Sequence, residues 1–322
     1  MEDDASDYSP AEQRLVDAIA AGAVCDFGGA AITADDMASW GPERTIRATV
    51  LRQLLDAEDA QNAQNAQNGV LLRGAVIEGI LDLKGISAVQ FDLQHCQIAT
   101  IEASGAIFTG DASFNGAIFT GDASFADATF TRHARFTDAT FTSDARFTDA
   151  TFTGYAWFNG ATFTSRAWFT DATFTSDARF TDAIADAYDF SRAQFHTTDP
   201  GPWVARQVTL TVAVFHVRAR LAVAAAAKCD CRRLQAREGV TSLSAVLRWI
   251  WRMPSSCGGA SWSTPGPSRL CPNATIQGNA PKGSTTSRPL SRRNGWRRRR
   301  RSNSQRIWPT NWAHNRCRKP GW

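Results

Sequence analysis

Phenylalanine residues recur through the middle of the chain at alternating intervals of six and five residues. The series is Phe108, Phe114, Phe119, Phe125, Phe130, Phe136, Phe141, Phe147, Phe152, Phe158, Phe163, Phe169, Phe174 and Phe180, and it returns at Phe190 and Phe195. In nearly every unit an alanine stands two places before the Phe, as Ala128 does before Phe130. The repeat is therefore eleven residues long, and each unit can bury its apolar side chains only by stacking on its neighbours.

Two apolar positions separated by one polar position, repeated every five or six residues, match neither a helix stripe nor a long alternating strand. The pattern predicts a short strand with Ala and Phe pointing inward, followed by a corner of two or three residues. Identical residues stack only if each coil has an even number of sides. Four sides, or two eleven-residue repeats per coil, are therefore expected, with Phe108 stacked on Phe130.

This register assigns the outward residues to faces and predicts a candidate interaction surface. Its members are Tyr155, Trp157, Trp168, Arg135 and Arg179. Exposed large aromatic side chains often mark interfaces. The alternative is structural, because Trp157 would lie between arginines of neighbouring coils, and exposed cation–π contacts contribute about 0.5 to 1 kcal/mol each. Threonines beside the Phe positions could also form a flat ice-binding face, although threonine is a good exposed strand residue.

Aspartates fall at the predicted corners and form a second set of candidate residues. They are Asp111, Asp122, Asp127, Asp138, Asp144, Asp149, Asp171, Asp177 and Asp182. Paired carboxylates can serve catalysis or calcium binding, but Asp also bonds its own backbone in turns and tolerates unusual dihedral angles. We interpret these residues as turn formers.

The eleven-residue unit contains two shorter motifs, such as Ala-Arg-Phe-Thr-Asp at 134–138 and Ala-Thr-Phe-Thr-Ser at 139–143. In these motifs the chain resembles the pentapeptide-repeat family over roughly residues 70 to 221, most strongly from 103 to 195. The resemblance implies a right-handed quadrilateral β-helix. The sequence departs from the commonest family form through its regular sixth residue and its central Phe in place of Leu.

The remaining sequence divides by composition. Residues 1–59 are predicted to be a helical cap, with one helix from Ser9 to about Val24 and a second over Pro42–Ala57. The first begins with Ser, Pro and Glu in capping positions. Residues 60–69 form a low-complexity linker, and 70–240 form the β-helix with degenerate coils at both ends. A cap makes physical sense because an open end exposes unpaired strand edges.

The last 82 residues, 241–322, contain 16 Lys or Arg and no Asp or Glu. One interpretation is a nucleic-acid-binding arm in which Arg297–Arg301 neutralise phosphates and Trp296 or Trp308 stacks on bases. The other is a disordered or frameshifted end, since arginine runs are common in disordered segments. Residues 1–199 carry a net charge of −17 against +21 for 200–322, so the predicted β-helix is acidic.

No residue pattern points to catalysis, a cofactor or a metal. The histidines show no ligand spacing and no phosphate loop or nucleophile motif is present; they are His95, His133, His196, His216 and His314. The seven cysteines include no Cys-x-x-Cys pair. We therefore expect a reduced, cytoplasmic protein. The apolar stretch 203–227 contains arginines and is not a predicted membrane span.

These observations predict a non-catalytic scaffold that binds a protein partner of unknown identity. Some proteins of the family it resembles imitate DNA and inhibit DNA gyrase, so a DNA-mimicking regulator is the alternative. Residues 103–195 hold 11 Asp against 6 Arg, which is a modest excess of negative charge for a DNA imitator. Nucleic-acid binding through the basic tail is a further alternative.

Overall fold

The structure is a computed structural model that describes residues 8–28, 37, 39–56, 69–197, 199–224, 228–238 and 240–246. The chain divides into two compact units, 1–280 and 281–322, and all described residues belong to the first. Most of the predicted linker and the predicted tail beyond residue 246 lie outside the described residues. The domain boundaries at 59, 69 and 240 therefore stay predictions.

Helix α1, Pro10–Ala20, begins as the sequence predicts. Ser9 Oγ accepts a hydrogen bond from the Glu12 backbone N–H at 3.2 Å, and Glu12 Oε2 accepts one from the Ser9 N–H at 2.8 Å. Arg47 donates to the same carboxylate from its backbone and its guanidinium, at 2.8 to 2.9 Å. Burial alone would raise the pKa of Glu12, but these hydrogen bonds outweigh it and lower the pKa to about 2. The pair therefore ties α1 to the second part of the cap.

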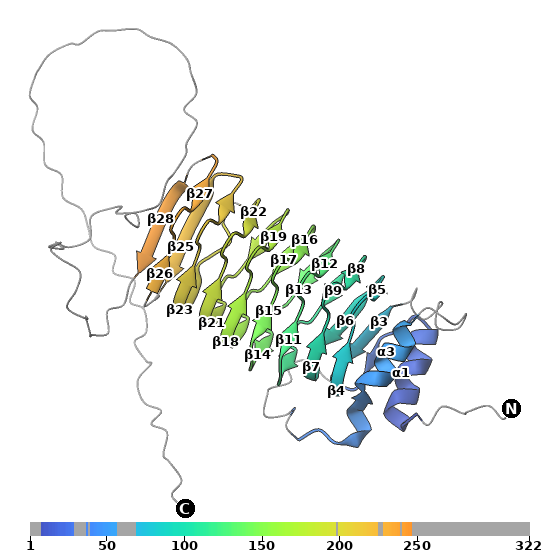
Figure 1. Cartoon of the computed structure of the whole chain (residues 1–322). Coiled ribbons are helices and arrows are strands. Elements are labelled where there is room, and N and C mark those ends of the chain that lie inside the picture. The colour runs from blue at the N-terminus through green and yellow to red at the C-terminus, as the bar shows by residue number, and fades with distance from the viewer. Residues whose placement is uncertain are drawn as a thin grey trace, which may run out of the picture. The chain divides into compact units, whose positions relative to one another are not determined.

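The second predicted helix, Pro42–Ala57, is wrong in its first half. Residues Pro42–Arg44 form the 3₁₀ helix η1, Thr45–Arg47 form strand β2, and only Ala48–Leu55 form helix α3. Strand β2 pairs with residues 76–78 of the first coil, and this tertiary pairing overrides helix propensity. Figure 1 shows α1 and α3 beside β3 and β4, where the cap covers the end of the first coil.

The body of the unit is a parallel β-solenoid whose strands form three sheets among the described residues. Sheet A contains β1 Cys25–Asp26, β3 Val70–Arg73, β6 Phe91–Gln94, β9 Ala112–Ser113, β13 Ala134–Arg135, β17 Ala156–Trp157 and β20 Ala178–Arg179. Sheet C contains β5 Ser87–Ala88, β8 Ile107–Phe108, β12 Thr129–Phe130, β16 Thr151–Phe152, β19 Thr173–Phe174, β22 Gln194–Phe195, β24 Val214–Phe215 and β27 Gln235–Ala236. Sheet B contains β2, β4 Val76–Asp82, β7 Gln97–Glu102, β10 Ile118–Phe119, β11 Ala123–Ser124, β14 Thr140–Phe141, β15 Ala145–Arg146, β18 Thr162–Trp168, β21 Ile184–Asp189, β23 Trp203–Thr209, β25 Ala219–Ala224, β26 Lys228–Asp230 and β28 Val240–Val246.

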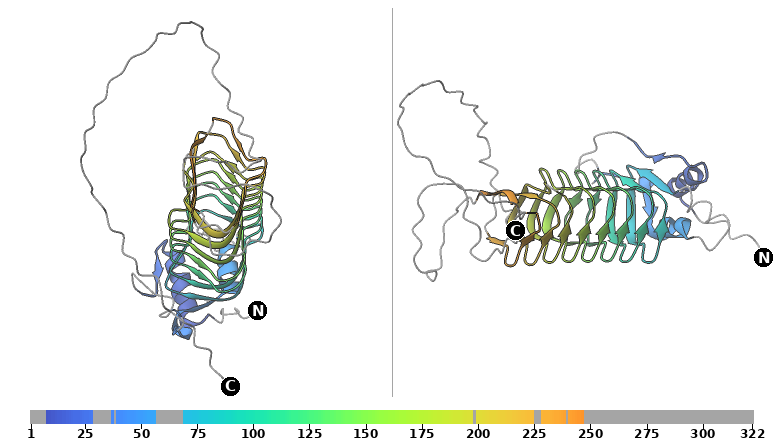
Figure 2. Two further views of the ribbon diagram at one scale, coloured as in Figure 1. Left: turned by 90° about the vertical axis from the view of Figure 1, so that its left-hand side faces the viewer. Right: turned by 90° about the horizontal axis from the view of Figure 1, so that it is seen from above.

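The strand register confirms four sides per coil. Phe130 pairs with Phe108 before it and Phe152 after it, each 22 residues away. Sheet B supplies two of the sides, because β18 runs around the corner from one to the other. We name the sides in chain order face C, face A, face B1 (from β10, β14 and the start of β18) and face B2 (from β11, β15 and the end of β18). Face A is therefore opposite face B2, and Figure 2 shows the coils stacked along one axis.

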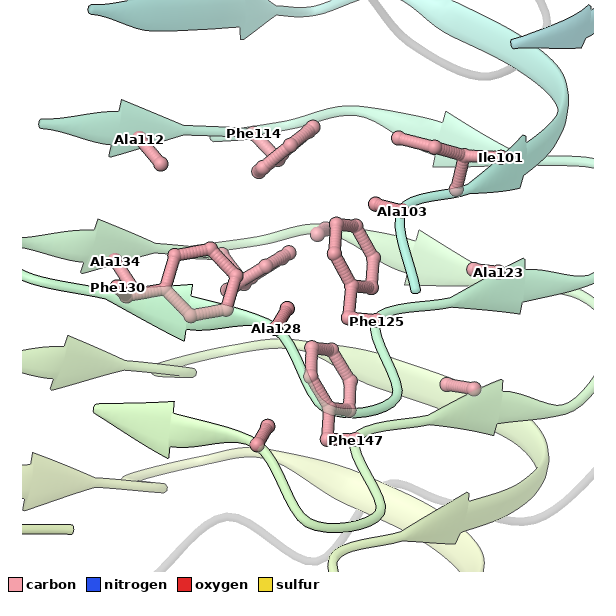
Figure 3. Close-up of a cluster of buried hydrophobic side chains, with 14 of the residues drawn as sticks. Ile101, Ala103, Ala112, Phe114, Ala123, Phe125, Ala128, Phe130, Ala134 and Phe147 are labelled. Carbon is pink, nitrogen blue, oxygen red and sulfur yellow. The ribbon is translucent and has the colours of Figure 1, made fainter. Parts of the chain in front are cut away.

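The interior is filled by the Phe side chains with Ala between them, all buried. Rings of successive coils stack in parallel; the Phe125 and Phe147 centroids, for example, are 5.1 Å apart (Figure 3). Rings on adjacent faces meet edge to face, as Phe125 and Phe136 do at 5.4 Å. Such geometries add about 0.5 to 1.5 kcal/mol per pair beyond area burial. The core accordingly runs without interruption from coil to coil.

Candidate interaction surface

Three aromatic rings on face A form a stacked group that we call the aromatic patch: His133, Tyr155 and Trp157. The His133 ring lies parallel to Tyr155 of the next coil, with centroids 5.0 Å apart, and 6.1 Å from the Trp157 centroid. The ring centroids of Tyr155 and Trp157, two positions apart on one coil, are 5.9 Å apart, and the ring planes are within 10° of parallel. Stacking between coils therefore restricts the orientation of the three ring planes.

Arginine and aspartate side chains frame the patch. Arg135 lies over the Trp157 ring at 5.6 Å and binds Asp111 of the preceding coil at 2.9 Å. On the following coil, Arg179 pairs with Asp177 at 2.7 Å. Strand pairing places Trp157 between Arg135 and Arg179, as the sequence predicts. The Asp111–Arg135 pair thus orients a cation on one side of the indole ring.

Trp168 does not join this group. It lies eleven residues after Trp157 on face B2, opposite face A, where it pairs with Arg146 in the strand register. Its ring is covered by Arg166 of its own coil at 4.5 Å. The five residues of the predicted surface therefore occupy two faces, with Tyr155, Trp157, Arg135 and Arg179 on one and Trp168 on the other.

Exposure differs between the two kinds of aromatic residue. Trp157 and Trp168 are half-buried, whereas Tyr155 is 42% exposed. Among the described residues, Tyr155 is the one aromatic side chain in the group of exposed large hydrophobics, which otherwise contains Val24, Ile80, Val89, Ile107 and Ile184. Tyr155 is thus the accessible part of the patch, while the Trp rings pack into the ladders beside it.

Face A also concentrates polar atoms that are buried and have no hydrogen-bond partner among the described residues. Five of the eight such side-chain atoms lie on its strands or at its two corners: Asp92 Oδ1, Ser113 Oγ and Trp157 Nε1 on the strands, and His133 Nδ1 and Asn159 Oδ1 at the corners. Burial raises the pKa of Asp92. Buried polar groups are normally paired, so face A differs chemically from the other three.

The corner aspartates fall into two structural classes. Five occupy the third position of a tight turn with φ between 55° and 59°, where Asp is tolerated and a β-branched residue is strained: Asp127, Asp138, Asp149, Asp171 and Asp182. The other four precede a strand at the opposite type of corner and pair with arginines: Asp111, Asp122, Asp144 and Asp177. The first class shapes the turns, and the second holds the arginine ladders in place.

Several threonines that directly follow a Phe use their hydroxyls within the scaffold. Thr131 Oγ1 donates to the Thr109 carbonyl oxygen at 2.7 Å, and Thr164 Oγ1 donates to that of Thr142 at 2.9 Å. Thr175 repeats the contact on face C at 3.0 Å. These hydroxyls are already bonded to the preceding coil, which weighs against the ice-binding alternative.

Two pairings escaped the sequence analysis because it treated histidines one at a time. His133 and Tyr155 are separated by 22 residues, and His196 and His216 by 20 residues, in each case one coil. The His196 and His216 rings stack with centroids 4.2 Å apart. The 22-residue coil, applied to every outward residue, would have placed His133 beside Tyr155, whereas the His196–His216 pair follows the shorter 20-residue step from Phe195 to Phe215.

The titratable side chains in the described part of the chain give no indication of a catalytic or metal site. No group of three or more His, Cys, Asp or Glu there could hold a metal ion. Burial raises the pKa of Cys25 to about 11 and that of Cys96 to about 12, which makes both thiols poor nucleophiles. No described helix is long and apolar enough to cross a membrane.

Comparison with known proteins gives one match. A family model described as pentapeptide repeats (9 copies) matches residues 103–151 and 147–194. No curated protein and no solved structure matches the chain. The matched residues are those in which the Phe period is most regular, which agrees with the resemblance noted from the sequence.

Proposed function

We propose that the solenoid, whose residues 103–194 match the pentapeptide-repeat model, is a non-catalytic scaffold that binds a protein partner through face A around Tyr155. The observation that carries this proposal is the exposure of Tyr155 within a group of stacked, pre-oriented rings. Tyrosine supplies a large amphipathic contact at low entropic cost because it has only two side-chain torsions.

Preorganisation supports the same proposal. His133 and Trp157 restrict the Tyr155 ring, and the Asp111–Arg135 and Asp177–Arg179 pairs bracket it along the face. A partner that docks on a rigid surface orders few additional side chains and so loses little affinity to entropy. The exposed part of Arg179, 55%, adds a donor for a partner's carboxylate or carbonyl groups.

The competing interpretation is that the patch only stabilises the solenoid. Replacing Trp157 with Ser removes the Arg135 contact and the Trp157 contacts with His133 and Tyr155, so this interpretation predicts lower stability with no partner lost. Replacing Tyr155 with Ser removes an exposed ring and leaves Trp157 in place. The two variants therefore separate stability from binding.

Affinity capture with the full chain tests the proposal. We expect a protein retained by the parent chain and lost with Tyr155→Ser. Ile184→Ser is the matched control, because Ile184 is 46% exposed but lies on face B1. If Tyr155→Ser and the control retain the same proteins, face A is not the binding surface.

A DNA-mimicking regulator, for example of gyrase, is the second candidate. Exposed Asp127 and Asp149 line one corner and Asp138 and Asp182 line the diagonal corner, so two rows of negative charge run along the solenoid. Against it, six other Asp side chains are neutralised by arginines: Asp111, Asp122, Asp144, Asp171, Asp177 and Asp186. A gyrase supercoiling assay with the full chain tests it, and unchanged supercoiling at the highest soluble concentration rejects it.

A further inference from the structure

One corner of the solenoid carries a single residue per coil whose charge reverses halfway along. We call it the B2/C column; it is formed by Asp127, Asp149, Asp171, Arg192, Val212 and Arg233. Each occupies the third position of the turn that joins face B2 to face C, with φ between 56° and 61°. Strands of successive coils lie about 4.8 Å apart, so the six residues form a line about 24 Å long.

The column is complementary to itself when read in the opposite direction. If a second column is placed antiparallel to the first, Asp127 of each copy faces Arg233 of the other, and Asp171 of each copy faces Arg192 of the other. Asp149 faces the neutral Val212, also twice. No like charges meet in this arrangement, and a shift by one coil would lose that property.

Local pairing leaves the ends of the column without partners. At its centre, Arg192 Nε and Asp171 Oδ1 are 2.7 Å apart. Among the described residues Asp127, Asp149 and Arg233 make no ion pair, although all three are exposed. Neighbouring like charges on adjacent strands are destabilising, so an opposite charge brought to Asp127 and Asp149 would relieve that repulsion.

The surroundings of the column permit close approach. The preceding turn position carries small side chains in five successive coils: Ala126, Thr148, Thr170, Ser191 and Thr211. On face C, the first outward position holds the uncharged series Thr129, Thr151, Thr173, Gln194, Val214 and Gln235. The wider charge distribution follows the same polarity, because residues 69–189 hold 7 Lys or Arg and 15 Asp or Glu, against 8 and 3 in residues 190–246.

We propose that a second copy of this chain binds antiparallel along the B2/C column, with a twofold axis at the Asp171–Arg192 pair. A twofold interface of this kind uses the same surface on both copies. The column lies on the corner diagonal to the one between faces A and B1, so face A stays free on both copies. The dimer would therefore present two aromatic patches, and a multivalent partner would gain avidity from it.

Charge exchange across the proposed interface gives a direct test with the full chain. Asp127→Arg places two positive charges opposite Arg233 of the second copy, and Arg233→Asp places two negative charges opposite Asp127. Each variant alone is expected to self-associate about tenfold more weakly in sedimentation velocity at low salt. The turn accepts both residue types, since Asp127 and Arg233 share a φ of 56°.

Restoration distinguishes this interface from lost folding or general charge effects. An equimolar mixture of the two single variants, and the double variant in one chain, should both recover the parent affinity to within about twofold. Asp138→Arg is the matched control, because it makes the same charge change at φ 55° on the diagonal corner and should have no effect. High salt should weaken the parent dimer.

Three outcomes overturn the proposal. The first is a parent chain that is monomeric at low salt, and the second is single variants that associate as tightly as the parent does. The third is a double variant that does not recover the parent affinity. In the last case the acidic half of the column binds something other than Arg233 of a second copy, such as the basic segment of the same chain. None of these outcomes affects the test of partner binding at Tyr155, because that test uses variants on face A.

Discussion

The regular coils between Ala103 and Phe180 and the later coils between Ala183 and Ala236 fill the same interior in different ways. In the regular coils each Phe stacks on the Phe of the next coil, with centroids 4.5 to 5.1 Å apart. In the later coils face B1 carries Ala185 and Ala205 where Phe163 would be repeated. The missing ring comes from Tyr188, which pairs with Ala167 and so occupies an Ala position.

This difference shows that the solenoid requires a filled volume in each coil rather than a ring at a fixed position. The Tyr188 ring meets Phe163 at 5.8 Å and Phe180 at 6.0 Å, edge to face, and is fully buried. The transfer has a cost, because the Tyr188 hydroxyl and Trp203 Nε1 are buried without hydrogen-bond partners in the described structure. Phe brings no such group into the regular interior.

The largest effect is expected from removing a ring in the regular coils. Phe147→Ala leaves a cavity lined by the rings of Phe125, Phe136 and Phe169, and should lower the free energy of unfolding by about 4 kcal/mol. Urea denaturation measures it. Ile184→Ala, at an exposed position, is the control and should change stability by less than about 0.5 kcal/mol. A loss below 1 kcal/mol for Phe147→Ala would show that neighbouring rings collapse into the space.

A double-mutant cycle tests whether Tyr188 replaces the ring missing at Ala185. Ala185→Phe alone overfills the coil and should cost about 1 to 3 kcal/mol. Tyr188→Ala alone opens a cavity and should cost about 3 to 5 kcal/mol. The double variant restores the regular pattern, so it should be more stable than the sum of the single losses by at least about 2 kcal/mol. Additive losses would mean that the two positions fill separate spaces.

The regular coils could be predicted from the sequence because one period determines their sides, register and inward residues together. The same period does not predict how the interior of the later coils is filled, because Tyr188 supplies the missing ring at a position where the pattern predicts Ala. It also missed strands β1 and β2 of the cap, which form by pairing with the first coil rather than from any local pattern. Periodicity therefore predicts what every coil shares, and tertiary pairing decides the exceptions.

The residues of the candidate surface could be predicted from the sequence, but the contacts among their side chains could not. Tyr155, Trp157, Arg135 and Arg179 follow from the register, and so does the placement of Trp168 on the opposite face. The stacking of His133 on Tyr155 depends on the rotamers of two corner residues, which the sequence pattern does not specify. The two classes of aspartate likewise depend on which corner has a left-handed residue.

Removing only the Tyr188 hydroxyl sharpens the comparison of the two regions. Tyr188→Phe keeps the ring and deletes a buried, unpaired polar group, so it should stabilise the chain by about 1 kcal/mol. Tyr155→Phe is the control, because that hydroxyl belongs to an exposed side chain. Thermal unfolding measures both. A destabilised Tyr188→Phe would mean that the hydroxyl has a hydrogen-bonding role in the folded chain.

The smallest effect is expected from mild acid, which should destabilise the later coils at a higher pH than it destabilises the cap. Burial, and then the positive charges of His196 and Arg237, lower the pKa of His216 below its ordinary 6.5. The unfolded chain therefore binds a proton more readily than the folded one, and stability falls as the pH drops below about 6.5. Glu12 has a lowered pKa of about 2, so its contribution is lost only as the pH falls from 4.5 toward 2.

Amide exchange at about pH 5.5 should rise around β24 and β27 and stay unchanged in α1. His216→Gln should abolish this first step, and a step that persists in that variant would assign it to another group.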